Sequence, residues 1–235
     1  VAALKALGFE KVFDTNTAAD LNIMEEATEF LERLQNGGKL PMITSCSPGW
    51  VRFAEKNYPD LLGHLSTCKS PHQMFGAVIK SYFAQKYEVP AEKICVVSVM
   101  PCIAKKYEAS REEMQVDGLR DVDYVITTRE LAKMIRQANI DFVNLEDSNF
   151  EDPMGEASGA GAIFGTTGGV MEAALRSAYF LLTGKNPKMD AFKKVRGMDG
   201  WKEAIFEIEG VAVKVAVVSG LGNTRKLIEA IKAGK

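Results

Sequence analysis

The chain has 235 residues, of which 46% are hydrophobic and 26% are charged, and its formal net charge is −2. This length allows one or two lobes with sizeable cores, and the composition is typical of a soluble globular protein. The small net charge gives no electrostatic reason to expect nucleic acid as a partner, and no apolar run reaches the roughly 18 residues of a membrane span.

Strands and helices alternate along the chain, and this pattern predicts an α/β fold. In chain order we expect a helix over 18–34, a strand over 40–44, a helix over 48–56, a helix over 70–86, a strand over 94–100, a strand over 123–127, a helix over 129–138, a helix-poor connection over 142–152, an apolar helix over 168–183, a hairpin of strands 204–208 and 211–219 around Glu209 and Gly210, and a helix over 224–233. The apolar face of the first helix is formed by Leu21, Met24, Ala27, Leu31 and Leu34.

The chain contains four unevenly spaced cysteines, and it is too large to need disulfides for stability. We therefore expect a reducing compartment, the cytoplasm, and metal chemistry. The chain begins at Val1 without an initiator methionine, so a targeting segment can precede it.

Cys102 follows the predicted strand 94–100, which Pro101 ends because proline has no backbone donor for a ladder. The thiol is therefore held at the rim of a rigid element, with Lys105 and Lys106 just beyond it. Nearby cations favour the thiolate, which is the form that binds metals. The alternative is a half-buried cysteine in an ordinary turn.

Cys46 follows the other predicted strand, 40–44, and precedes a helix. Ser47 is typical of an N-cap, and Pro48 occupies the first helical position. Free backbone N–H groups and the helix dipole favour negative charge there. An ordinary junction with a small buried cysteine remains an equal interpretation for Cys46 alone. Two strand-end cysteines in similar surroundings together indicate part of an iron–sulfur site.

Segments 44–50 (TSCSPGW) and 100–108 (MPCIAKKYE) resemble the first two signature motifs of iron-only (FeFe) hydrogenases. The likeness continues through 117–121, 126–131 and 155–176, and so covers nearly the whole chain. A third family motif, a CxxxC pair with two more cluster cysteines, is absent, as are the N-terminal ferredoxin-like domains. We expect residues 1–235 to be part of the catalytic domain, inactive as an isolated fragment.

The resemblance implies two lobes of twisted, mostly parallel sheets flanked by helices, with the active site in the cleft between them. The full enzyme would reversibly reduce protons to dihydrogen, with electrons from ferredoxin or a similar carrier. Its H-cluster, a 4Fe-4S cubane linked to a di-iron subcluster, would be inserted by maturation proteins. Two alternatives remain: a non-catalytic iron–sulfur assembly or sensory homologue of the same fold, and an apo fragment that serves as an interaction module.

The resemblance also assigns roles around this cofactor. Cys102 matches a cubane ligand, and Lys105 matches the lysine that binds a cyanide of the di-iron unit. Met100, Pro71 and Phe164 match residues that contact the cofactor. For Lys105, the alternative from the residues alone is an exposed lysine in a turn.

Two positions deviate from the family pattern. Cys46 stands at the position of a proton-relay cysteine, and Ser47 stands where many hydrogenases have a cubane ligand. Serine is a poor iron ligand beside a thiolate. Either Cys46 takes over ligation, or Ser47 binds through oxygen, or the site is weak. His72 replaces a frequent glutamine, and a structural histidine is favoured over one that titrates near the cavity.

Carboxylates are concentrated on the helix before Cys46. Glu26 and Glu29 share a face, and Arg33 follows Glu29 by four residues, an arrangement that also suits a solvated surface pair. By resemblance, Glu26, Glu29, Arg33 and Ser66 match a proton pathway with Cys46 as the last relay. Carboxylates can carry protons in this way because partial burial raises their pKa toward neutrality.

Glycines recur between 159 and 169, but their spacing is not GxGxxG and no P-loop Lys-Ser/Thr follows. We therefore expect close helix packing, or close approach of the backbone to a cofactor, instead of a nucleotide site. These glycines are Gly159, Gly161, Gly165, Gly168 and Gly169.

Overall fold

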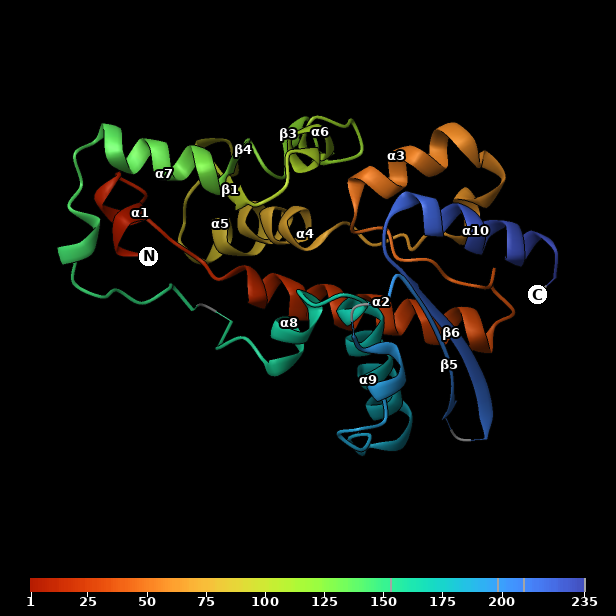
Figure 1. The fold of residues 1–235 in the computed structure, drawn as a ribbon. Helices are drawn as coiled ribbons and strands as arrows, with labels where there is room; N and C mark the ends of the chain where they lie inside the picture. The colour runs from red at the N-terminus through yellow and green to blue at the C-terminus, as the bar shows by residue number, and fades with distance from the viewer. Residues whose placement is uncertain (153, 198, 209, 235) are drawn as a thin grey trace. The chain divides into compact units, whose positions relative to one another are not determined.

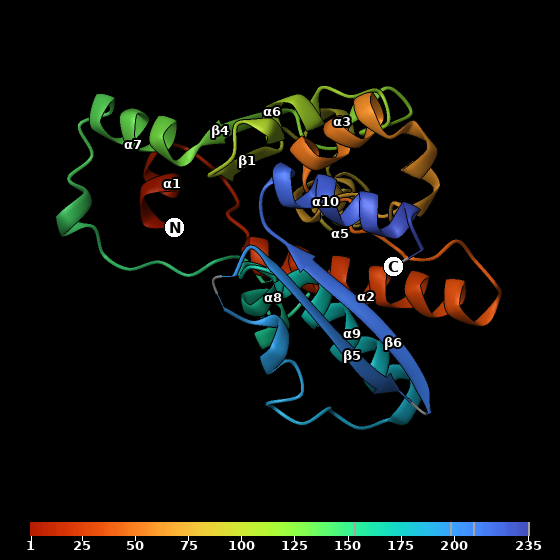
Figure 2. The ribbon, with the colours of Figure 1, turned by 45° about the vertical axis from the view of Figure 1, so that its right-hand side comes forward.

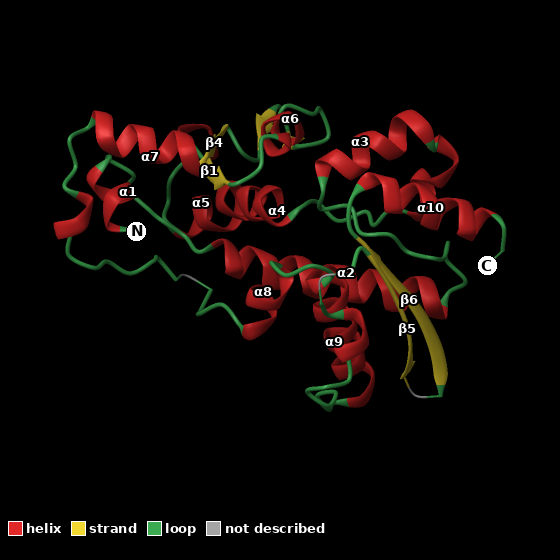
Figure 3. Cartoon of the chain, viewed as in Figure 1, coloured by secondary structure: helices red, strands yellow, loops and turns green. Residues whose placement is uncertain are grey.

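The structure, a computed structural model, describes residues 1–152, 154–197, 199–208 and 210–234 (Figure 1). The chain divides into two compact units, each built from separate segments. The first unit comprises Val1–Asn22 and Cys68–Ser158, and the second comprises Ile23–Thr67 and Gly159–Lys235. Helices alternate with short strands, which confirms the α/β class (Figure 3). No helix of the described residues is both long and apolar enough to cross a membrane.

The first unit contains a parallel pair of strands, β1 (Val97–Met100) and β4 (Tyr124–Thr127). The chain between them forms α6 (Ala104–Ala109) and a small antiparallel hairpin, β2 (Gln115–Val116) with β3 (Leu119–Arg120). Strand β1 is shorter than the predicted 94–100, because it begins only at Val97. A 3₁₀ turn over residues 91–93 precedes it. It still ends at Met100, and this leaves the following cysteine at the strand terminus.

One helix was predicted over 70–86, before β1 in the chain. The first unit has a long helical run there. It consists of α4 (Pro71–Val78), a π-helical turn (Ile79–Phe83) and α5 (Ala84–Lys86). The buried Phe83 ring stacks on the Phe13 ring, with centroids 5.4 Å apart, and meets the Phe75 ring edge-on at 5.9 Å. This aromatic cluster anchors the run whose first turn carries Pro71.

The other helices of the first unit are α1 (Ala2–Ala6) and α7 (Thr128–Gln137). Helix α7 begins with a capping box, in which Thr127 and Glu130 satisfy each other's backbone N–H groups. The connection over 142–152 has only a 3₁₀ turn, Phe142–Asn144, as predicted.

The second unit is built around α9 (Gly169–Thr183) and the hairpin of β5 (Trp201–Ile208) and β6 (Val211–Val218), which run side by side in Figure 2. Leu175 of α9 shares a buried core with Val213 and Val217 of β6. Of the predicted hairpin turn, Glu209 lies outside the described residues. The remaining elements are α3 (Pro48–Asn57), α8 (Gly159–Phe164), α10 (Leu221–Lys232), and two 3₁₀ turns, Pro59–His64 and Lys193–Val195.

Helix α2 (Thr15–Gln35) contributes to both units, which divide between Asn22 and Ile23. Its predicted apolar face is wrong at Met24, which is 47% exposed. The buried positions around it include Asn22 and Glu26, both fully buried. The helix therefore buries polar groups that a hydrophobic pattern assigns to solvent.

The predicted strand over 40–44 is also wrong. The segment forms only one parallel bridge, between Ile43 and Leu65. Pro41 has no backbone donor, and the partner segment leaves its 3₁₀ turn just before the bridge. Strand pairing in the described residues is mixed, since β1–β4 is parallel while β2–β3 and β5–β6 are antiparallel.

The glycines before α9 are required by close packing, as predicted. A Cβ atom on Gly169 would lie 1.7 Å from the Ile163 carbonyl oxygen. A Cβ atom on Gly168, whose φ is +80°, would lie 2.8 Å from Val217. Gly159 has open space around it, so this constraint is local to the junction of α8 and α9.

Gly169→Ala is expected to lower the free energy of unfolding by about 2 kcal/mol, because the added methyl group meets a backbone carbonyl that cannot move aside. Chemical denaturation measures the change. Gly159→Ala is the matched control and should be neutral or slightly stabilising. Equal stability of the two variants would contradict the packing argument.

Candidate functional site

The first unit holds Cys102, half-buried just beyond the end of β1. Lys105 follows on α6, and its side chain is only 12% exposed. Its Nζ donates to Glu108 Oε2 at 3.0 Å. Lys105 is therefore an enclosed, ion-paired cation and not the exposed turn lysine that the sequence left open.

Glu108 is the centre of a buried polar cluster in the first unit. Its Oε2 atom accepts hydrogen bonds from Ser70 Oγ at 2.9 Å, His72 Nε2 at 2.6 Å and Lys105 Nζ. Burial alone would raise the pKa of Glu108, but His72 and Lys105 outweigh it and hold the pKa below its usual value. Glu108 therefore stays ionised inside the protein.

His72 is buried, and its Nδ1 lies 2.9 Å from Ser98 Oγ. Its pKa is lowered, chiefly because burial disfavours the charged imidazolium. Both ring nitrogens thus have protein partners, which confirms the structural histidine favoured from the sequence.

Three further residues of the first unit lie close in sequence to this cluster. Pro71 is buried at the first position of α4, and Met100 is the half-buried last residue of β1. Gln73 is fully buried, and neither its Oε1 nor its Nε2 has a hydrogen-bond partner within the described ranges. A buried amide in this state requires a polar partner from outside the described protein atoms.

The second unit brings together Glu29, Arg33 and Ser66. Glu29 Oε2 accepts a hydrogen bond from Ser66 Oγ at 2.7 Å, and Glu29 Oε1 accepts one from Arg33 Nη2 at 2.6 Å. Both side chains of the ion pair are about nine-tenths covered, with 13% and 14% exposed, so this is not a solvated surface pair. Burial raises the pKa of Glu29, but hydrogen bonds from Ser66, Thr67 and Arg33 outweigh it and lower the pKa.

Glu26 lies one turn before Glu29 and differs from it in having no ion-pair partner among the described residues. It is fully buried, and neither carboxylate oxygen has a hydrogen-bond partner in the described part of the chain. Burial, followed by the charge of Glu29, raises its pKa to about 7, against a smaller opposite effect of Ser66. Glu26 can therefore take up and release a proton near neutral pH.

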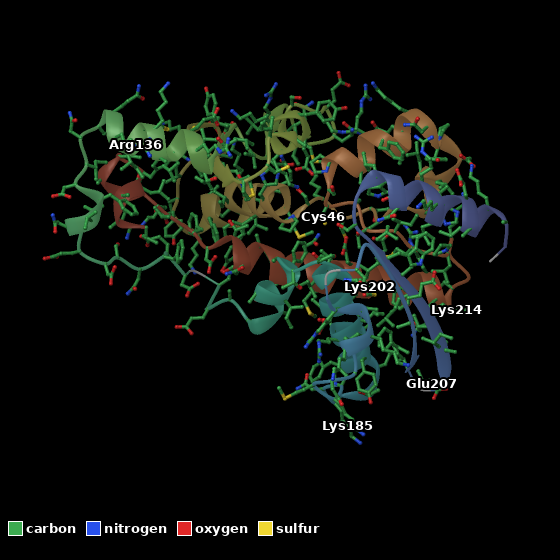
Figure 4. All side chains as sticks on the ribbon, in the orientation of Figure 1. Cys46, Arg136, Lys185, Lys202, Glu207 and Lys214 are labelled. Atoms are coloured by element: carbon green, nitrogen blue, oxygen red, sulfur yellow. The ribbon has the colours of Figure 1, made fainter. Side chains whose placement is uncertain are left out.

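Cys46 is half-buried on the segment that leads into α3 (Figure 4). Ser47 is exposed at the N-cap position of α3, but its hydroxyl makes no capping hydrogen bond. Trp50 Nε1 is buried without a hydrogen-bond partner in the described residues. Phe164 is the half-buried last residue of α8.

A metal site is not visible inside either unit taken alone. In the described residues, no three His, Cys, Asp or Glu side chains gather as a metal-binding group. The thiols of Cys102 and Cys46 belong to the first and second unit respectively. The donor chemistry nevertheless suits an iron–sulfur group, since both are thiols at the ends of elements.

Sequence reasoning missed the role of Glu108. It was noticed only as the end of a motif, although it stands three residues after Lys105 on one helix, a spacing that predicts side-chain contact. The unpartnered Gln73 was also missed, and no sequence signal identifies it.

Glu26→Gln is expected to remove a pH dependence of stability. The unfolded carboxyl ionises near its ordinary pKa of 4.5, whereas the folded one ionises near 7. The stability contributed by Glu26 is therefore complete below about pH 4.5, falls as the pH rises, and is lost above about pH 7. This difference in pKa corresponds to about 3 kcal/mol.

Denaturant titrations of both proteins between pH 4.5 and pH 8 test this. The wild type should lose about 3 kcal/mol relative to Glu26→Gln across that window. Parallel stability curves for the two proteins would show that Glu26 ionises normally.

Comparison with known proteins identifies the family of the chain. Residues 1–235 match the family model described as "Iron only hydrogenase large subunit, C-terminal domain". The chain belongs to this family.

The chain spans only part of the length of the proteins that it matches. It is 54% identical over 240 residues to the NADP-reducing hydrogenase subunit HndD of Solidesulfovibrio fructosivorans, covering 100% of the chain and 41% of that protein. It is 36% identical to a probable cytosolic Fe-S cluster assembly factor of Aedes aegypti, covering 98% of the chain and 50% of that protein. Apo [FeFe]-hydrogenase HydA1 from Chlamydomonas reinhardtii, variant C377H, superposes with a TM-score of 0.85 at 42% identity, covering 99% of the chain and 66% of that structure.

Proposed function

We propose that the protein is an FeFe hydrogenase, which reversibly reduces protons to dihydrogen with electrons from ferredoxin or a similar carrier. The observation that carries this proposal is Glu26, a fully buried acid whose pKa is raised to about 7 beside the hydrogen-bonded pair of Glu29 and Ser66. A reaction that consumes protons at a buried site needs groups that exchange them near neutral pH. An assembly scaffold has no such need.

The residues of the proposed proton route become more buried from its outer end to its inner end. Glu29 is half-buried, Ser66 is 5% exposed, and Glu26 is fully buried. Arg33 holds Glu29 as a carboxylate at the outer end, and the Ser66 hydroxyl both donates and accepts, as a relay requires. Glu26 then holds the proton before Cys46, which is proposed as the last relay.

The residues suit the H-cluster, a 4Fe-4S cubane linked to a di-iron subcluster. When bound, this group supplies the redox chemistry that combines electrons with protons. In the proposal, the Cys102 thiolate binds the cubane, and the enclosed Lys105 ammonium donates to a cyanide ligand. The unpartnered amide atoms of Gln73, in the same unit as Cys102 and Lys105, support a polar group in addition to the described protein atoms.

Other residues of the chain shape the surroundings of the cofactor. Pro71, Met100 and Phe164 are buried or half-buried, and we assign them to the lining that excludes water. If a residue of this segment binds the cubane, Cys46 would do so in place of its relay role, because a thiolate suits iron better than the neighbouring Ser47 hydroxyl does.

The partners follow from the same proposal. A ferredoxin-type carrier supplies electrons, and maturation proteins supply the di-iron unit. We place the protein in the cytoplasm because its four thiols suit a reducing compartment. The assembly-factor alternative is supported by lower identity, 36% against 54%, and leaves the raised pKa of Glu26 without a use.

Cys102→Ala is expected to abolish the cubane, because no other described thiol stands at the end of β1. Iron analysis and the electron paramagnetic resonance signal of the intact protein measure the loss. Cys95→Ala, which removes an exposed thiol of the same unit, is the matched control and should keep both. An unchanged iron content in Cys102→Ala would refute the ligand assignment.

In the complete enzyme, Glu29→Gln is expected to lower hydrogen evolution at least about 100-fold while the iron content stays unchanged, since an amide cannot pass on a proton. Hydrogen evolution with reduced methyl viologen between pH 6 and pH 8 measures it. Glu25→Gln, an exposed neighbour on α2, is the control. Near-wild-type rates for Glu29→Gln would show that the ion pair of Glu29 with Arg33 has only a structural role.

A further inference from the structure

His72 has no part in the proposed reaction, yet it joins three elements of the first unit. It stands on α4, its Nε2 lies 2.6 Å from Glu108 Oε2 on α6, and its Nδ1 lies 2.9 Å from Ser98 Oγ in β1. All three side chains are buried. A buried imidazole with two partners of different chemistry has a defined hydrogen arrangement.

The chemistry of the partners fixes that arrangement. An ionised carboxylate only accepts hydrogen bonds, so His72 Nε2 carries the hydrogen that points to Glu108. A neutral imidazole then has only an acceptor at Nδ1, and Ser98 Oγ must donate to it. Burial supports the neutral form, since it lowers the pKa of His72. Glu108 thus fixes the tautomer in which His72 donates to it, and the Ser98 hydroxyl orients the ring by donating to Nδ1.

His72 and Lys105 are linked because both donate hydrogen bonds to the same atom, Glu108 Oε2. Glu108 Oε2 accepts hydrogen bonds from Ser70, His72 and Lys105. Ser70 and His72 both lie at the start of α4, and together these two donors fix the carboxylate against rotation. Lysine is a point charge on a flexible stem, and the fixed carboxylate is what directs its ammonium group.

We propose that His72 is a positioning residue which, as the Nε2–H tautomer fixed by the Glu108 carboxylate and oriented by Ser98, holds Glu108 so that the Lys105 ammonium keeps one position near the end of β1. The contact between Lys105 and a cofactor in this inference rests on the proposed function. The relay from Ser98 through His72 and Glu108 to Lys105 exists without it.

Two substitutions of His72 distinguish positioning through hydrogen bonds from a role as a space-filling side chain. His72→Gln offers an amide donor for Glu108 and a carbonyl acceptor for Ser98, whereas His72→Leu offers neither. His64, the other histidine of the chain, contacts the Pro41 carbonyl in the second unit, and His64→Gln serves to assign spectra.

The first readout is ¹⁵N nuclear magnetic resonance of the imidazoles in the intact protein at pH 7. We expect one neutral imidazole protonated at Nε2 that disappears in His72→Gln and persists in His64→Gln. Ser98→Ala should keep this tautomer, because Glu108 still accepts the hydrogen of Nε2. An imidazolium, or an Nδ1–H tautomer, at His72 in the wild type would overturn the proposal.

The second readout is the rate at which Lys105 reacts with an amine-directed reagent, measured by mass spectrometry against Lys106 as internal reference. His72→Leu should raise the Lys105 rate about tenfold, the equivalent of ~1.4 kcal/mol and the size of one hydrogen bond to a charged group. His72→Gln should restore the wild-type rate. Equal rates in the wild type and His72→Leu would overturn the proposal.

If His72→Leu fails to fold, Ser98→Ala decides, since it removes only the hydrogen bond to Nδ1 that orients the ring and should raise the Lys105 rate by a smaller factor. An unchanged rate there would overturn the proposal. A protein that meets these expectations but binds no iron would refute the proposed function and leave the positioning role intact.

Discussion

The interior of each unit depends on how buried carboxylates are compensated. Moving an ionised carboxylate out of water costs several kcal/mol unless cations and donors replace its hydration. Glu29 meets Arg33, Glu108 meets Lys105, and Glu172 meets both Arg176 and Arg196. Burial raises the pKa of each acid, but its partners outweigh burial and the pKa is lowered. Glu26 has no such compensation, and its pKa is raised.

The compensated pairs also connect different elements within a unit. Glu172 joins α9 to the segment after the 3₁₀ turn Lys193–Val195, and Arg176 lies over the Phe192 ring at 4.7 Å. Glu29 joins α2 to the segment that carries Ser66 and Thr67. Breaking such a pair by removing one partner leaves a buried charge, which is why each pair fixes local geometry more firmly than its net stability suggests.

Local signals predicted the elements near the cysteines well. Pro101 ends β1 and Pro48 begins α3, because proline acts on its own neighbours regardless of the rest of the fold. The strand over 40–44 could not be predicted in this way, since a strand exists only where another segment offers a ladder. Here the partner, Leu65, gives a single bridge. The exposure of Met24 likewise depends on contacts that helical periodicity does not contain.

The candidate site shows the same division between local and long-range information. Helical spacing placed Glu26 and Glu29 on one face, but the two acids differ through residues distant in sequence, such as Ser66, which is 37 positions from Glu29. Ser66, Thr67 and Arg33 all hydrogen-bond to Glu29, whereas the oxygens of Glu26 have no hydrogen-bond partner in the described part of the chain. Two identical carboxyl groups therefore favour opposite protonation states at one pH. Residues that donate to one acid and not to the other set this difference, because pKa values diverge where burial is compensated at one carboxyl group and not at its neighbour.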